Sequence, residues 1–502
     1  MSKTWRFPGG LHLPGYKEIS TTLPVAAAAV PRYLIFPLQQ HIGAPAKPLV
    51  AAGDKVLKGQ MIAKADGYVS APVHASSSGT VVAVEERPIP HPSGLRALCI
   101  VVETDGRDEW IAHQPVRHYT QLDPSALRNV IREAGIVGLG GAGFPTFIKL
   151  NRTPDKIIDT LILNGAECEP YITCDDMLMR ERPEEIIAGL FIMRHALQAR
   201  ACIIGIEDNK PEAAAALARV IHDLHVKDVR IALLPTRYPA GGEKQLIQTL
   251  TGKEVPSNGL PLHIGVVCHN VGTAVAVHRA VNHGEPLISR YVTVSGPGIE
   301  QPRNLDARLG TPMRDLIAQC GAPHEGRFLM GGPMMGFALH DLDAPVIKTT
   351  NCILAQPQPA PQTVLPCIRC GACAEVCPAS LLPQQLYWHA RAKDFSKAQA
   401  YNLFDCIECG CCNAVCPSHI PLVDYYRFAK TEIAAQEQEK RKADVARRRH
   451  EFRLQRLERE KQERAARQEQ KKAAASEHAG ADAVQAAIAR AQSKAAQQET
   501  ST

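Results

Sequence analysis

The order of hydrophobic and polar positions changes several times along the chain, and each change marks a different type of predicted element. From residue 31 to 118, short apolar runs alternate with turn pairs such as Gly53-Asp54 and Ser78-Gly79. This pattern predicts a small β domain. Its expected strands cover residues 32–37, 60–65, 79–85 and 97–103.

Between residues 119 and 258, buried-strand patterns alternate with amphipathic helices. A helix is expected from Pro124 to just before Gly135, because Asp123 is a good N-cap and proline is favoured at the first helical position. Repeated strand–helix alternation then predicts a parallel sheet. The expected strands are 160–163, 201–206 and 229–234, and the expected helices are 183–197 and 211–224.

The other segments are a smaller unit, a linker, a cysteine-rich domain and the two ends of the chain. Residues 259–340 predict an α+β unit, with strands over 262–267, 290–295 and 327–330 and helices over 273–282 and 312–319. Further expected parts are an arm over 1–30, a Pro-rich linker over 341–362, a domain over 363–432 and a tail over 433–502. The tail is mostly Ala, Gln, Glu, Lys and Arg, so a helical or disordered segment is expected there.

Most of the net charge lies in that tail. The chain has 57 Lys and Arg, of which 16 follow residue 432 and 41 lie in the body. It has 51 Asp and Glu, of which 11 follow residue 432 and 40 lie in the body. A nearly neutral body argues against a nucleic-acid partner, whereas a basic tail would suit a membrane or an acidic partner. No apolar run approaches the ~18 residues of a membrane span, and no secretory signal is visible. The chain is therefore expected in the cytoplasm, or on a membrane through contact with partners.

Eight of the 16 cysteines repeat one spacing twice, C-x-x-C-x-x-C-x-x-x-C-P. The first segment holds Cys367, Cys370, Cys373 and Cys377, and the second holds Cys406, Cys409, Cys412 and Cys416. This is the spacing of bacterial ferredoxin [4Fe–4S] sites, in which the fourth cysteine reaches the other cluster. The alternative is two zinc sites, although zinc usually takes pairs of ligands separated by a longer spacer.

The spacing therefore predicts two crossed sets of ligands. Cys367, Cys370, Cys373 and Cys416 should hold one cluster, and Cys377, Cys406, Cys409 and Cys412 the other. Cys411 lies between ligands and is interpreted as a small packed side chain. The remaining seven cysteines are expected to be buried small hydrophobes.

A glycine-rich loop follows the first predicted helix, at Gly138, Gly140, Gly141 and Gly143. A classical dinucleotide turn would follow a strand instead. Successive glycines nevertheless let backbone N–H groups approach a phosphate and let flat rings lie against the chain. Lys149, on a short helix that opens at Pro145, could contact a phosphate or a ring.

A second polar segment, Asn164-Gly-Ala-Glu167-Cys-Glu169-Pro170, follows the strand expected at 160–163. Ligands bind at the carboxyl ends of parallel strands in α/β folds. Asn164 and the two glutamates could hydrogen-bond a ribityl chain or a ribose. A solvated acidic loop that includes Asp175 and Asp176 is the alternative.

These segments together resemble a known family. Residues 138–150 and 164–170 are similar to the flavin-binding, NADH-oxidising subunit of respiratory complex I, and so are 238–244 and 269–271. The order of parts resembles the RnfC component of the Rnf/Rsx ion-translocating electron transport complexes more closely, over residues 5–432. The β domain, with Gly53-Asp54-Lys55-Val56, resembles barrel-sandwich folds, but Lys64 does not match a carrier lysine.

The resemblance implies a multidomain α/β plus β fold. Its parts would be a barrel-sandwich-like domain, a flavin-type α/β domain, a β-grasp-like unit and a helical two-cluster ferredoxin domain, followed by the tail. It also implies FMN, NAD(H) and two [4Fe–4S] clusters, and an electron relay without a catalytic acid, base or nucleophile. The implied partners are membrane subunits of the same complex and ferredoxin or another iron–sulfur or flavin subunit. The implied location is the cytoplasmic face of the inner membrane.

Site residues follow from the same resemblance. The loop over 138–143 would line the FMN, and Phe144 and Glu169 would face the nicotinamide nucleotide. The flavin phosphate, ribityl chain or ring edge would contact Lys149, Asn164 and Glu167. The flavin site would be closed by Gly241, Glu243 and Asn270.

Four positions depart from the complex I pattern, at Leu139, Ala166, Gly242 and His269. They suggest that FMN is weakly held, and they leave two other hypotheses open. One is a soluble flavin/iron–sulfur reductase of the corrin-reductase type. The other is a non-catalytic adaptor that carries electrons through its clusters while its nucleotide loop is vestigial.

Overall fold

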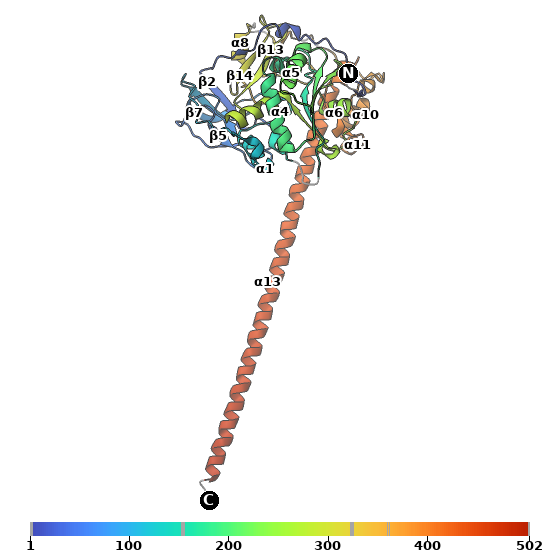
Figure 1. Ribbon diagram of the computed structural model, residues 1–502. Helices are drawn as coiled ribbons and strands as arrows, with labels where there is room; N and C mark the ends of the chain where they lie inside the picture. Colours follow the sequence, from blue (N-terminus) through green and yellow to red (C-terminus); the bar gives the residue numbers. More distant parts are fainter. Residues whose placement is uncertain (1–3, 152–155, 322–325, 359, 361, 500–502) are drawn as a thin grey trace. The chain divides into compact units, whose positions relative to one another are not determined.

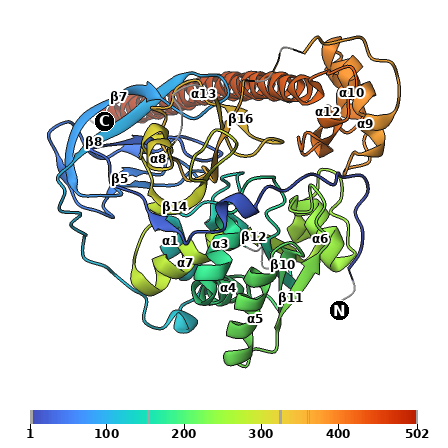
Figure 2. The ribbon, with the colours of Figure 1, turned by 90° about the horizontal axis from the view of Figure 1, so that it is seen from above.

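A computed structural model describes residues 4–151, 156–321, 326–358, 360 and 362–499. Outside it lie residues 1–3 of the predicted arm, 152–155 of the predicted 119–258 domain, 322–325 of the predicted 259–340 unit, 359 and 361 of the predicted linker, and 500–502 of the predicted tail. The chain forms two compact units, Met1–Arg427 and Phe428–Thr502. Figure 1 shows the chain, and Figure 2 shows β7 and β8 at one side of the first unit and α9, α10 and α12 at the other.

The first domain is made of two antiparallel sheets, ordered β2-β8-β7-β4 and β3-β5-β6. Their inward side chains form one core, which includes Phe36, Ile62, Val81 and Ile100. This confirms the predicted β domain. The strands are β2 (Tyr33–Pro37), β3 (Lys47–Pro48), β4 (Lys55–Val56), β5 (Met61–Lys64), β6 (Val73–His74), β7 (Gly79–Pro88) and β8 (Arg96–Thr104).

The second domain has a four-stranded parallel sheet, ordered β11-β10-β9-β12. As predicted, Asp123 caps its first helix by accepting a hydrogen bond from the Ser125 backbone N–H at 2.7 Å. The strands are β9 (Thr160–Gly165), β10 (Ala201–Glu207), β11 (Val229–Leu234) and β12 (Val266–Asn270). The helices are α1 (Pro124–Glu133), α2 (Thr146–Lys149), α3 (Cys174–Glu181), α4 (Pro183–Leu197), α5 (Pro211–Asp223), α6 (Glu243–Thr251) and α7 (Val271–His278). Short turns are η2 (Tyr119–Gln121), η3 (Pro261–Ile264) and the π-helical turn η4 (Arg279–His283).

One predicted strand belongs to a different sheet from the one expected. A strand over 262–267 is predicted in the smaller α+β unit, but the turn η3 occupies most of that run and the strand β12 covers Val266–Asn270. β12 pairs in parallel with β9 and completes the sheet of the second domain. That assignment is wrong, and a boundary at residue 258 would cut this sheet. The partner strand lies about a hundred residues earlier, and hydrophobic periodicity carries no information on such pairing.

The third domain is a six-stranded mixed sheet, ordered β1-β14-β13-β17-β15-β16. It draws β1 from the N-terminal arm and β17 from the segment predicted as a linker. The prediction of a linker over 341–362 is therefore wrong where it includes β17, because four of the five β17 residues are buried. The elements are η1 (Glu18–Ser20), β1 (Ala26–Ala27), β13 (Ser289–Ser295), β14 (Arg303–Arg308), α8 (Met313–Gln319), β15 (Arg327–Met330), β16 (Phe337–Ala338) and β17 (Cys352–Gln356).

The cysteine-rich domain consists of short helices, and the chain then continues as one long helix. The short elements are α9 (Ala372–Glu375), α10 (Pro383–Arg391), α11 (Phe395–Ala400), η5 (Leu403–Asp405) and α12 (Cys411–Ala414). The long helix α13 (Leu422–Glu499) agrees with the helical form expected for the tail. Among the helices of the described residues, none has the length and apolar character to cross a membrane.

Candidate functional site

The glycine-rich loop joins α1 to α2 and is closed at its base. Val137 and Pro145 form an isolated antiparallel bridge, and the Gly138 N–H donates to the Phe144 carbonyl at 2.8 Å. Gly141 and Gly143 have φ of +108° and +63°, which favours glycine at both positions. Gly140 and Gly141 are exposed. The loop therefore presents bare backbone to solvent, as a site for a phosphate or a flat ring requires.

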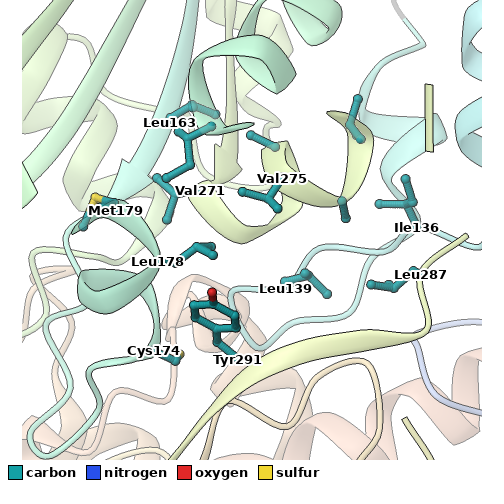
Figure 3. Packing of buried hydrophobic residues seen from close by; sticks show 14 of the residues in the cluster. Ile136, Leu139, Leu163, Cys174, Leu178, Met179, Val271, Val275, Leu287 and Tyr291 are labelled. Carbon is teal, nitrogen blue, oxygen red and sulfur yellow. The ribbon is translucent and has the colours of Figure 1, made fainter. Parts of the chain in front are cut away.

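Leu139 anchors the loop from inside. Its side chain is 5% exposed and lies among buried side chains that include Leu178, Val275 and Tyr291 (Figure 3). These four residues line a cavity of about 250 Å³. Its N–H donates to the Thr273 hydroxyl at 3.0 Å, and its carbonyl accepts from Arg290 at 3.2 Å. A leucine at this position replaces the arginine of the complex I pattern and supports the loop instead of reaching a ligand.

Four of the predicted site residues meet where β9 and β12 end. Asn164 and Asn270 are neighbours in the sheet register. The Asn164 side-chain amide donates to the Gly241 carbonyl at 2.8 Å. A Cβ on Gly140 would lie 3.3 Å from the Asn270 Cβ. The structure thus gathers the glycine loop and three later segments at the carboxyl edge of the parallel sheet, where α/β folds bind ligands.

Lys149 and Glu243 contribute a charged pair to this edge. Lys149 ends α2 and Glu243 begins α6, and their side chains form a salt bridge. Both are partly exposed, at 26% and 40%. The lysine therefore supplies a cation within reach of solvent next to the segment that carries Gly241 and Glu243. Of the other predicted residues in the loop, Phe144 is half-buried.

Glu167 and Glu169 have partners within the protein. The Glu167 carboxylate accepts the backbone N–H groups of Asp175 and Asp176 at 2.7 and 3.1 Å, and so it caps α3. The Glu169 carboxylate accepts the N–H groups of Met334 and Met335 at 2.6 and 3.0 Å, and burial raises its pKa. Asp176 is 1% exposed, so the alternative of a solvated acidic loop is wrong.

Two lysines that the sequence did not reveal, one half-buried and one buried, hold the backbone of this motif. Lys17 donates to the carbonyls of Glu167, Glu169 and Ile172 at 2.7, 3.0 and 2.6 Å. Lys210 is fully buried and donates to the Ala166 carbonyl at 2.7 Å and to Glu207 at 3.1 Å. Periodicity gives no signal for either lysine, because each acts on residues more than forty positions away.

The eight cysteines of the repeat lie in two groups of four, each around its own cavity. The outer set is Cys367, Cys370, Cys373 and Cys416. The inner set is Cys377, Cys406, Cys409 and Cys412, and Cys411 lines the same cavity. These are the crossed sets that the spacing predicts. Each cavity is lined by four thiols of the repeat, with Cys411 as a fifth in the inner one, and by no histidine or carboxylate, which suits an iron–sulfur cluster in each.

The inner set adjoins the flavin-type domain. The Tyr238 hydroxyl, in the segment that carries Gly241 and Glu243, donates to the Cys409 carbonyl at 2.6 Å. Tyr238 also packs in a small apolar cluster with Cys409 and Cys411, and Cys168 of the polar motif touches that cluster. The Cys168 sulfur accepts the Gly241 N–H at 3.2 Å. One continuous set of contacts thus joins the polar motif to the inner cysteines.

Family models match the chain in four consecutive regions. They are the RnfC barrel sandwich hybrid domain over 5–107, the Nuo51 FMN-binding domain over 131–279, the SLBB domain over 291–338 and a 4Fe-4S dicluster domain over 366–420. The predicted multidomain fold is confirmed, and so are the predicted cofactor classes, FMN and [4Fe–4S].

Curated relatives, each named as the C component of an "Ion-translocating oxidoreductase complex", are similar over most of the chain. The one from Pseudomonas aeruginosa is 54% identical over 92% of this chain and 60% of its own length. The one from Yersinia pestis is 50% identical over 91% of this chain and 74% of its own length. Among solved structures, an NAD⁺-reducing [NiFe]-hydrogenase has a TM-score of 0.43 at 24% identity, over 55% of this chain and 54% of that one. The chain spans about 60% of the length of the first relative.

The sequence resemblance, the four domains and their order therefore agree. The chain is 50% identical to the Yersinia pestis relative and spans 74% of that relative's length. It therefore belongs to the RnfC family, the C components of the ion-translocating oxidoreductase complexes.

Proposed function

We propose that this chain is the peripheral, NADH-linked subunit at which electrons enter a membrane-bound, ion-translocating oxidoreductase complex of the ferredoxin:NAD type. One observation carries this proposal. A single compact unit combines an exposed glycine loop at the edge of a parallel sheet with two sets of four cysteines, and Tyr238 links the two sites by its hydrogen bond to the Cys409 carbonyl.

The chain's own residues would act mainly by binding and orientation. The backbone of residues 140–143 would lie against the flavin, and Lys149 would neutralise its phosphate. Asn164 and Asn270 would offer side-chain amides to the ribityl chain or ring edge, beside Gly241. When bound, FMN accepts an electron pair from NADH and releases the electrons singly, which one-electron iron–sulfur clusters require.

Three further roles are proposed with it. Phe144 and the segment of Glu169 would face the nicotinamide nucleotide. The inner and outer cysteine sets would each hold one [4Fe–4S] cluster as thiolate ligands. The proposed partners are membrane subunits of the same complex and ferredoxin or another iron–sulfur or flavin subunit, on the cytoplasmic face of the inner membrane.

The test is to purify the chain without oxygen, add NADH, and record the visible and EPR spectra. The proposal expects flavin bleaching followed by signals of reduced clusters. If dithionite reduces the clusters but NADH does not, even with added FMN, the nucleotide site is inactive. The adaptor hypothesis would then replace the proposal. The burial of Leu139, in place of an arginine, is the observation that favours that hypothesis.

A further inference from the structure

The N-terminal arm lies between the flavin-type domain and the cysteine-rich domain and contacts both. Its Trp5 N–H donates to the Thr249 carbonyl of α6 at 3.0 Å. Leu11 and Tyr238 exchange two backbone hydrogen bonds of 2.7 and 2.8 Å. Between these contacts, the Gly10 N–H donates to the Val376 carbonyl at 2.9 Å, one residue before Cys377. The arm is therefore bonded to both domains within seven residues.

Gly9 brings the arm against the inner cysteine set itself. A Cβ at this position would lie 2.6 Å from the carbonyl carbon and oxygen of Cys377 and 2.6 Å from the carbonyl carbon of Val376. Its φ of +59° also favours glycine. The backbone of the arm thus packs directly on the backbone of Cys377, and no other amino acid fits there without displacing one of them.

Side chains of α6 also contact the cysteine-rich domain close to the inner cysteine set. The Gln245 side chain donates to the Pro378 carbonyl at 3.1 Å, and Lys244 pairs with Asp405 at 3.0 Å. Together with the Tyr238–Cys409 bond, these contacts reach residues in or next to the inner set. Cys409 and Cys412 are each only 7% exposed.

The outer set lies in a different setting. The residues lining both cavities come from the cysteine-rich segment, so the two sets differ in their exposure and in the contacts around them. Cys370 is exposed, and the neighbouring Ile368 is 68% exposed. This set therefore faces solvent, while the inner set faces the flavin-type domain.

We infer that residues 5–11 of the arm are a positioning element that fixes the inner cysteine set against the flavin-type domain, so that the inner set is the nearer of the two to the flavin site. This inference rests on the proposed function. The outer set is then the one left open to a redox partner. The arm acts through the backbone of Cys377 and touches no reacting group.

A pair of matched glycine substitutions tests the arm. Gly9→Ala pushes a methyl group into the Cys377 backbone, whereas Gly15→Ala is the control, since the nearest atom to its Cβ is the Lys17 Cγ at 3.8 Å. Tyr238→Phe is a second variant, which removes only the hydroxyl that donates to Cys409. Cys370→Ser identifies the EPR signal of the outer cluster, because it changes one ligand of that set.

Each chain would be titrated with dithionite while EPR follows both clusters, and NADH-driven reduction would then be timed. We expect Gly9→Ala and Tyr238→Phe to shift the midpoint potential or EPR signature of the inner cluster alone, and to slow its reduction by NADH roughly tenfold or more. Gly15→Ala should match the unsubstituted chain.

The inference is overturned if both variants leave the inner signal unchanged, or if they alter the outer signal instead. If the Gly9→Ala chain binds no iron at the inner site, the potential and EPR signal of the inner cluster in Tyr238→Phe still test the inference. The dithionite titration needs neither flavin nor NADH, so its result is distinct from a failure of the proposed function. If NADH reduces no cluster in any chain while the potentials shift as expected, the positioning role stands and the proposed function fails.

Discussion

Single residues hold the polar motif after β9 in an unusual backbone conformation. Glu167 has a φ of +46°, which is costly for a residue with a side chain. Lys17 and Lys210 compensate by donating to four carbonyls between Ala166 and Ile172. Burial lowers the pKa of Lys17, and the nearby Glu167 carboxylate opposes that shift. The lysines act here as hydrogen-bond donors to the backbone and shape a site they do not line.

Replacing Lys17 by Met should loosen this motif. Three carbonyls would lose their donor, and an unsatisfied buried polar group costs about 1–3 kcal/mol. We expect a lower thermal unfolding midpoint and weaker FMN binding, measured by calorimetry and by fluorescence titration of the flavin-depleted chain. Lys55→Met, at an exposed position of β4, is the control and should change neither. Unchanged FMN affinity in Lys17→Met would contradict the role given to this lysine.

Asp175 should make stability depend on pH. Burial, and next the Glu167 carboxylate, raise its pKa to about 7 from 3.8. Between those values the unfolded chain releases the proton that the folded chain keeps bound, so this group's contribution to stability is full below about pH 4 and is lost as the pH rises to 7. Asp175→Asn should therefore raise the melting temperature at pH 8 by roughly 2–4 °C per kcal/mol recovered, and by little at pH 5.

The neighbouring carboxylate is the control for that measurement. Asp176 is paired with Arg180 at 2.7 Å, so Asp176→Asn should lower the melting temperature at both pH values. An Asp175→Asn chain whose melting temperature shifts equally at pH 5 and pH 8 would rule out the titration. The titration would also be ruled out if the melting temperatures of the two variants changed with pH in the same way.

At the scale of elements, the close crossing of α4 and α7 depends on one glycine. A Cβ on Gly189 would lie 1.9 Å from the Ala274 carbonyl oxygen and 2.5 Å from its carbon. Since both atoms are backbone, a methyl group can be accommodated only by moving one helix. Because α7 begins directly after Asn270, its displacement would also reach the candidate flavin site.

Gly189→Ala should accordingly destabilise the flavin-type domain, although the same substitution usually stabilises a helix by about 1 kcal/mol. Overpacking of this kind costs about 1–3 kcal/mol, so a lower denaturation midpoint in urea is expected. Gly480→Ala is a matched control within helix α13, since no atom lies within 4 Å of its Cβ. A Gly189→Ala chain as stable as the Gly480→Ala chain would show that the helices can separate without cost.

Local patterns predicted most elements because those elements are specified locally. The helix over 183–197 has the predicted bounds, since Pro183 starts it and Gln198 ends it in a left-handed conformation. The strand β12 is predicted in the wrong unit because its pairing with the distant strand β9 leaves no local pattern in the sequence. The cysteine spacing and the glycine loop identified the candidate sites. Lys17, by contrast, could not be found, because only the folded chain brings it to Glu167.

At the scale of the whole molecule, the crossing of the two cysteine segments couples their sites. Each set takes three residues from one segment and one from the other. A cluster in either site would therefore tie the segment from 367 to 377 to the segment from 406 to 416. The cysteine-rich domain should then depend on iron for its stability, because ligands that metal holds together are part of folding free energy.

Single cysteine substitutions separate crossed from uncrossed pairing. Cys377→Ala should abolish the EPR signal that Cys409→Ala also abolishes, and Cys416→Ala the signal that Cys370→Ala abolishes. Iron and sulfide analysis should give about half of the full content in each case. Cys411→Ala is the control and should retain both signals. If Cys377→Ala and Cys370→Ala remove the same signal, each segment binds its own cluster and the crossed assignment fails.

The exposure of Cys370 also sets an order of damage. Oxidants attack thiolates according to their accessibility, and Cys370, a predicted ligand, is at the surface while Cys409 and Cys412 are buried. Peroxide would therefore reach the outer site first and leave its neighbour intact. Restoring the protein would then require reassembly of the cluster at one surface site, while the buried site still holds the two cysteine segments together. The opening that would admit a redox partner thus also makes the outer site the first to be oxidised and the more accessible one to reassemble.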